Sequence, residues 1–162
     1  MKILIAADSF KDALPSLAAC QAIERGIRKS SPGAQTILFP LADGGEGTAE
    51  ILQFHLGGDM ISVEVADPFF RPVEAKYLLA GEVAFIEMAQ ASGLQLLALP
   101  ERNPLETSTC GTGQLILDAA LRGAKKIMLA IGGSATNDAG MGMAAALGWR
   151  FLSENGEELL PV

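Results

Sequence analysis

Short apolar runs that end directly in polar or glycine-rich loops are the feature of this sequence that most limits its fold. Residues 2–7 form one such run, which ends at Asp8, and residues 125–131 form another, which ends at Gly132. An unbroken apolar run of this length is typical of a strand buried on both faces of a parallel sheet. Ligands bind such sheets at the carboxyl ends of the strands, so we expect functional residues in the loops that follow.

The elements after the first run alternate in the order of an α/β fold. Residues 16–29 carry apolar side chains at spacings of three and four, which predicts an amphipathic helix. A second strand is expected over residues 35–40, then a glycine loop and a helix that ends at Gly57. This order indicates parallel strands joined by right-handed crossovers.

The pattern changes near residue 60. Three strand-like segments follow, at residues 61–65, 73–79 and 83–86. Their short connections predict antiparallel pairing. Helical character returns at residues 112–122, and a helix of small residues follows the apolar run at 125–131. We therefore expect residues 1–60 to belong to one α/β domain and residues 61–162 to a second, with an approximate boundary.

Composition narrows the class of function. The chain has 162 residues, of which 49% are hydrophobic, and a net charge of -7 with only 12 basic residues. The hydrophobic content suits a globular domain with a buried core, and the charge leaves no basic stripe for a nucleic acid. The first residues form a short strand with too few apolar residues for an export signal or a membrane span. We therefore expect a cytoplasmic protein without a membrane partner.

The loop after the first strand brings together a carboxylate, a hydroxyl and an ammonium group, on Asp8, Ser9 and Lys11. This position is where α/β sheets bind ligands. The alternative is that Asp8 or Ser9 only caps a helix and that Lys11 is solvated.

The glycine loop at residues 43–47 combines two acids with three glycines. Glycine lets backbone N–H groups approach a phosphate or carboxylate closely, and carboxylates such as Asp43 and Glu46 suit Mg²⁺. A tight turn with a capping box is the alternative. Glu87, at the end of an apolar strand, is expected to pair with a loop cation or to form a structural salt bridge.

Two further loops offer hydrogen-bond donors to an anion ahead of helices. Asp138, in the second of them, is free to act as a base or as a metal ligand, although an ordinary capping loop is the alternative. The donors are Asn103, Thr107 and Thr109 in one loop and Gly132, Gly133 and Ser134 in the other. No Walker A motif and no GxGxxG fingerprint occur, which excludes the commonest nucleotide-binding folds.

Taken together, these motifs resemble those of the bacterial glycerate kinase family, glycerate 2-kinase type. The resemblance covers residues 1–157 and is supported by the stretch around Arg102–Leu105 and Gly111–Gly113. Family members are much longer, so we expect this chain to be the N-terminal part of the family length. The motifs that carry the resemblance, in chain order, are Asp8-Ser9-Phe10-Lys11, Ala42–Thr48, Ile86–Ala89, Ala91–Leu94 and Gly132–Asp138.

The resemblance implies ATP-dependent phosphorylation of D-glycerate to 2-phosphoglycerate with Mg²⁺. It also implies a flavodoxin-like domain with a second α/β domain inserted into it, present here only in part. Within this scheme Lys11 neutralises phosphate charge, and either Asp8 or Asp138 is the base. Asp43 and Glu46 hold the metal or the substrate hydroxyls, and the ligand anions are bound by Ser9, Gly44, Gly45, Asn103, Thr107, Thr109, Gly132, Gly133 and Ser134.

Two alternatives stay open at the level of sequence. In the first alternative to the glycerate kinase interpretation, the chain is a fragment that binds an anion or a nucleotide without catalysis. In the second, it is a phosphotransferase for another small hydroxy acid, because fold and loop style do not fix a substrate. The sequence does not define the oligomeric state. It also has Ala139 after Asp138, where the family usually has glycine, which restricts this loop.

Overall fold

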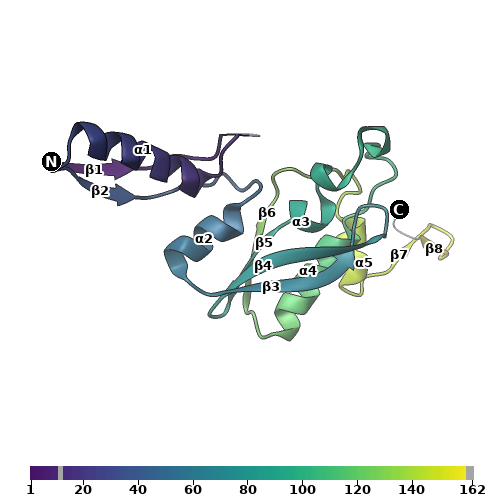
Figure 1. The fold of residues 1–162 in the computed structure, drawn as a ribbon. Helices are drawn as coiled ribbons and strands as arrows, with labels where there is room; N and C mark the ends of the chain where they lie inside the picture. Colours follow the sequence, from purple (N-terminus) through teal and green to yellow (C-terminus); the bar gives the residue numbers. More distant parts are fainter. Residues whose placement is uncertain (11–12, 160–162) are drawn as a thin grey trace.

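The chain has a mixed α/β fold, seen here in a computed structural model that describes residues 1–10 and 13–159 (Figure 1). A small N-terminal unit lies beside a larger body built on a four-stranded sheet. In chain order the elements are β1 (Lys2–Ile5), α1 (Ser16–Ser30), β2 (Gln35–Leu38), α2 (Thr48–Leu56), β3 (Asp59–Ala66), β4 (Pro72–Ala80), β5 (Val83–Glu87), α3 (Ala89–Ser92), the 3₁₀ turns Leu94–Leu96 and Leu99–Glu101, α4 (Cys110–Leu121), β6 (Lys126–Ala130), α5 (Met141–Ala146), β7 (Phe151–Leu152) and β8 (Glu158–Leu159).

The N-terminal unit is a β–α–β crossover, as the sequence predicts. β1 and β2 pair in parallel, with Ile5 opposite Leu38, and α1 covers one face of the pair. Ile5 and Cys20 are buried between the strands and the helix. The opposite face is bare in the described part of the chain, where Leu4 and Ile37 lie side by side with 61% and 47% of their surfaces exposed.

The larger sheet has the strand order β3-β4-β5-β6. β3, β4 and β5 are antiparallel, which confirms the pairing predicted from their short connections. β6 then joins the sheet parallel to β5, after a long crossover that contains α3 and α4. The carboxyl ends of β5 and β6 therefore lie together at one edge of the sheet.

Helices cover both faces of this sheet. α4 packs against one face, where the core contains Tyr77, Ile86 and Leu115. Side chains alternate along a strand, so the paired residues Leu78 and Phe85 face the other side, against which α2 packs. α2 thus contacts β4 and β5, although it precedes the boundary expected near residue 60, and that boundary stays a prediction.

The last described residues form the hairpin β7–β8, whose strands have only two residues each. The sequence carries no strand pattern there, because two residues are too few to show an alternation. None of the helices in residues 1–10 and 13–159 is both long enough and apolar enough to cross a membrane.

Candidate functional site

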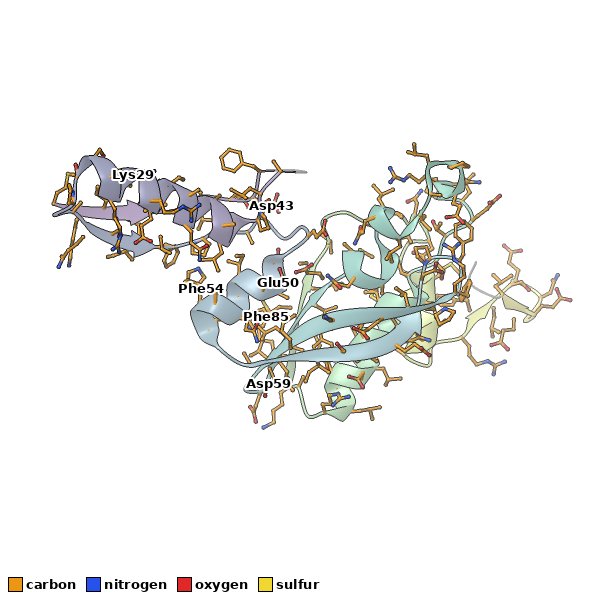
Figure 2. The ribbon with its side chains drawn as sticks, in the orientation of Figure 1. Lys29, Asp43, Glu50, Phe54, Asp59 and Phe85 are labelled. Atoms are coloured by element: carbon orange, nitrogen blue, oxygen red, sulfur yellow. The ribbon has the colours of Figure 1, made fainter. Side chains whose placement is uncertain are left out.

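The candidate site is an open cleft of about 820 Å³ at the junction between the two parts of the molecule. The loop after β1 contributes Asp8 and Ser9, and the loop before α2 contributes Asp43 and Glu46. Figure 2 shows Asp43 at this junction, close to the start of α2, which carries Glu50. Gly133, which follows β6, completes the wall. The carboxyl ends of strands from both sheets thus meet at one cleft, as expected for a ligand site in an α/β protein.

The loop at residues 43–47 is folded by its own hydrogen bonds. The Gly45 N–H donates to Oδ1 of Asp43 at 2.9 Å, and the Thr48 hydroxyl donates to the Gly45 carbonyl at 2.7 Å. Gly44 and Gly47 have φ angles of 92° and 85°, in the region that favours glycine. Gly44 and Gly47 therefore allow the backbone of this loop to turn, while Asp43 and Glu46 are exposed to the cleft.

The two glycine loops touch each other. The Gly132 N–H donates to the Gly44 carbonyl at 3.1 Å. A side chain at position 132 would place its Cβ 2.8 Å from both the Gly44 oxygen and the Gly45 Cα, which is closer than van der Waals contact allows. Glycine at 132 is thus required by the approach of two backbones, and the structure brings together loops that are far apart in the sequence.

Glu87 lies directly behind this loop and is the residue whose role the sequence did not reveal. The residue is 2% exposed, and its carboxylate accepts hydrogen bonds from the Ala49 N–H at 2.6 Å and from the Gly47 N–H at 3.2 Å. No ion pair to Glu87 occurs within the described residues. The expected pairing with a loop cation stays a prediction, because Lys11 lies outside these residues. The partners that the structure describes are N–H groups at the start of α2, where a helix N-terminus attracts negative charge.

Asp138 performs a similar role at α5. Its Oδ2 accepts hydrogen bonds from the Thr109 N–H at 2.8 Å, the Thr109 hydroxyl at 2.7 Å and the Gly142 N–H at 3.0 Å, and its Oδ1 accepts one from Gly140. Burial by itself raises the pKa of Asp138, but the bonds from Thr109 and the two glycines outweigh burial and lower this pKa below its ordinary value. The carboxylate therefore joins the start of α4 to the start of α5.

The remaining predicted ligand residues are also engaged within the protein. Thr107 is buried, and its hydroxyl donates a hydrogen bond to the Ala135 carbonyl at 2.9 Å. Oδ1 of Asn103 accepts a bond from the Leu105 N–H at 3.2 Å, and the hydroxyls of Ser134 and Thr136 bond to each other at 3.0 Å.

The structure thus separates the predicted site residues into two groups. The first lines the cleft and contains Asp8, Ser9, Asp43, Gly45, Glu46 and Gly133, with Gly44 and Gly132 joining the two glycine loops beside it. The second does not line the cleft and contains Asn103, Thr107, Thr109, Ser134 and Asp138. Lys11 lies outside the described residues. The cleft wall, as far as the structure describes it, carries carboxylates and no basic side chain.

The described carboxylates of the cleft do not form a complete metal site by themselves. In residues 1–10 and 13–159, no group of three or more acidic, histidine or cysteine side chains is placed to hold a metal ion. Mg²⁺ does not need such a group, because it binds through one or two carboxylates and keeps water and phosphate oxygens as its other ligands. Asp43 and Glu46 therefore fit a magnesium ion that arrives with phosphates, and they do not form a closed protein cage.

Comparison with known proteins identifies the class to which this fold and cleft belong. The chain belongs to the glycerate kinase family, whose model matches residues 3–162. It is 53% identical over 159 residues to a glycerate kinase of Halalkalibacterium halodurans, and this match covers 97% of this chain and 42% of that protein. A glycerate 2-kinase of Escherichia coli is 47% identical over 161 residues, which is 98% of this chain and 42% of the enzyme.

A solved structure agrees with these sequence matches. The crystal structure of a Salmonella typhimurium LT2 protein, assigned as glycerate kinase 2, superimposes with a TM-score of 0.85 at 47% identity. The match covers 98% of this chain and 43% of the Salmonella chain. The present chain therefore spans about two fifths of the length of the relatives that it matches. Its mixed α/β fold corresponds to that part of the Salmonella structure.

Proposed function

We propose that this chain supplies part of the active site for ATP-dependent phosphorylation of D-glycerate to 2-phosphoglycerate. One observation carries the proposal: loops that follow the carboxyl ends of strands from both sheets converge on a single cleft. The family to which the chain belongs supports the choice of reaction, and two relatives carry the names glycerate kinase and glycerate 2-kinase.

In the proposed reaction a hydroxyl of D-glycerate attacks the γ-phosphorus of ATP, the bond to the β-phosphate oxygen breaks, and the hydroxyl proton leaves to a base. The protein has to align the two reactants and to stabilise the charge that develops. Mg²⁺, when bound with the nucleotide, neutralises phosphate charge. We assign Asp43 and Glu46 as its protein ligands, since both carboxylates are exposed to the cleft.

For the base, we propose Asp8 in preference to Asp138. Asp8 is exposed and lines the cleft, and among the described residues it accepts one hydrogen bond, from the Ser9 N–H at 2.6 Å. Asp138 is surrounded by N–H and hydroxyl donors and its pKa is lowered, which makes it a weak proton acceptor. We assign Asp138 the structural role of joining the starts of α4 and α5. We assign Ser9 a hydrogen bond with the substrate carboxylate.

The test measures ligand binding and turnover separately. Isothermal titration calorimetry with D-glycerate and with MgATP, alongside an assay of ADP formation, would be run on the chain and on its Asp8→Asn and Asp43→Asn variants. Asp59→Asn is a matched control, because Asp59 is exposed at the start of β3, away from the cleft. We expect Asp43→Asn to weaken MgATP binding about tenfold or more, and Asp8→Asn to remove turnover while D-glycerate still binds.

Each other outcome has a distinct meaning. Binding without ADP formation in the unsubstituted chain would leave an anion- or nucleotide-binding segment of a kinase. Binding of other hydroxy acids as tightly as D-glycerate would reject the substrate. Equal loss in Asp59→Asn and Asp43→Asn would reject the cleft as the site.

A further inference from the structure

A buried carboxylate that the proposed reaction does not use lies directly behind the cleft. Glu87 closes β5 and is almost fully buried. It accepts hydrogen bonds from the backbone of Gly47 and Ala49, and a weaker one from the Gln90 amide at 3.4 Å. Burial of a charge is costly unless hydrogen bonds compensate it, so a carboxylate at this position has to be held by the helix that it caps.

The two N–H groups that Glu87 binds belong to the junction of loop and helix. Gly47 is both the last residue of the glycine loop and the N-cap of α2, with a φ of 85°. At the other end of the same loop, the Gly44 carbonyl accepts a hydrogen bond from Gly132. The loop is therefore fixed at its two ends, by a side chain from β5 and by the backbone of the loop that follows β6.

The same contact determines where an anion does not bind. Helix N-termini are common phosphate sites because their N–H groups are unpaired. At α2 these groups already face the Glu87 carboxylate, and a second anion there would meet like charge. This leaves the exposed side of the loop, with Asp43 and Glu46, as the part that faces ligands.

From these contacts we infer that Glu87 is a positioning residue. Its carboxylate occupies the N-terminus of α2 in place of a ligand phosphate, and by holding Gly47 it keeps the loop at residues 43–47 against Gly132 at the mouth of the cleft. The inference rests on the proposed function only for the meaning of the cleft. The contacts themselves are testable without any substrate.

Amide hydrogen exchange measured by nuclear magnetic resonance tests this role directly. Glu87→Gln keeps the size of the side chain and replaces one carboxylate oxygen by a donor, which cannot accept from an N–H group. We expect exchange at Gly47, Ala49 and Gly132 to be at least about tenfold faster in this variant, and exchange in β4 to be unchanged. Glu64→Gln, on the exposed side of β3, is the matched control.

A chemical rescue separates a specific carboxylate role from general loss of packing. Glu87 and Ala49 also line a second cavity, of about 370 Å³, which has space for a small carboxylate such as formate beside this position. We expect Glu87→Ala to show the same fast exchange, and added formate to restore slow exchange in this variant and not in Glu87→Gln. Thermal unfolding of each variant, followed by circular dichroism, verifies that it is folded.

Two results would overturn the inference. If Gly47 and Ala49 exchange faster while Gly132 does not, Glu87 only caps the helix and does not position the loop. If formate has no effect on folded Glu87→Ala, the site does not select a carboxylate. Calorimetry with D-glycerate and MgATP on the same samples keeps the two proposals apart: absence of binding by the unsubstituted chain rejects the proposed function, whereas the exchange data decide the role of Glu87.

Discussion

Replacing Gly132 by alanine tests the contact between the two glycine loops. In Gly132→Ala the new Cβ would lie 2.8 Å from the Gly44 oxygen and 2.8 Å from the Gly45 Cα. Backbone atoms cannot rotate away as side-chain ends can, so we expect the loops to separate by roughly half an ångström. The hydrogen bond from Gly132 to Gly44, now 3.1 Å, would then exceed the usual limit for such bonds.

The magnitude follows from these two effects. Overpacking of a well-packed contact costs about 1–3 kcal/mol, and a lost hydrogen bond costs about 1 kcal/mol. We therefore expect Gly132→Ala to lower the free energy of unfolding by about 2–4 kcal/mol. The measurement is urea denaturation followed by far-ultraviolet circular dichroism, with the denaturant slope compared between variants.

A matched control uses the same substitution where there is space. Gly26 lies within α1, and a Cβ added there meets no atom within 4 Å apart from the neighbouring backbone of its own helix. Gly26→Ala is expected to raise the free energy of unfolding by about 0.5–1 kcal/mol, because alanine favours a helix more than glycine does. If Gly132→Ala were as stable as the unsubstituted chain, the close approach of the two loops would be refuted.

Three further substitutions test contacts outside the cleft. Asp138→Asn should lower the free energy of unfolding by about 2 kcal/mol at neutral pH. The lowered pKa of Asp138 means that its contribution is present above the ordinary value of 3.8 and is lost as the pH falls below it, so acid titration of stability should show a smaller drop in the variant. Ala139→Gly should raise the melting temperature slightly, by relieving about 1 kcal/mol of strain at a φ of 52°. Tyr77→Phe should cost about 1 kcal/mol in urea denaturation, since the Tyr77 hydroxyl donates to Asp118 at 2.8 Å, and an unchanged midpoint would contradict that bond.

Much of the fold could be predicted from the sequence because its elements are local. The apolar run before Asp8 and the helix over residues 16–29 define a crossover with few alternatives, and the structure contains it as β1, α1 and β2. Short connections between residues 60 and 87 likewise required antiparallel neighbours. The sequence did not show that α2 packs on the second sheet, because its own pattern does not identify the partner of its apolar face.

The site was less predictable, for a reason that concerns hydrogen bonding. A loop ahead of a helix contains both groups that face ligands and groups that satisfy the unpaired N–H donors of the helix. Asp43 and Asp138 both lie in glycine loops, yet one is exposed to the cleft and the other is bound by Thr109 and two glycines. Sequence spacing does not separate these cases, since either role needs a short acidic side chain.

The bare face of the β1–β2 pair has a consequence for the behaviour of this chain in solution. Leu4 and Ile37 lie on that face, and Phe39, just beyond β2, is also exposed. Within the described residues, each strand also has one edge of peptide groups without a neighbouring strand. We expect the colloidal stability of the chain to be governed by this unit more than by the net charge of -7. Light scattering should then increase with protein concentration and with sulfate, which strengthens apolar contacts, and should fall when Ile37 is replaced by threonine.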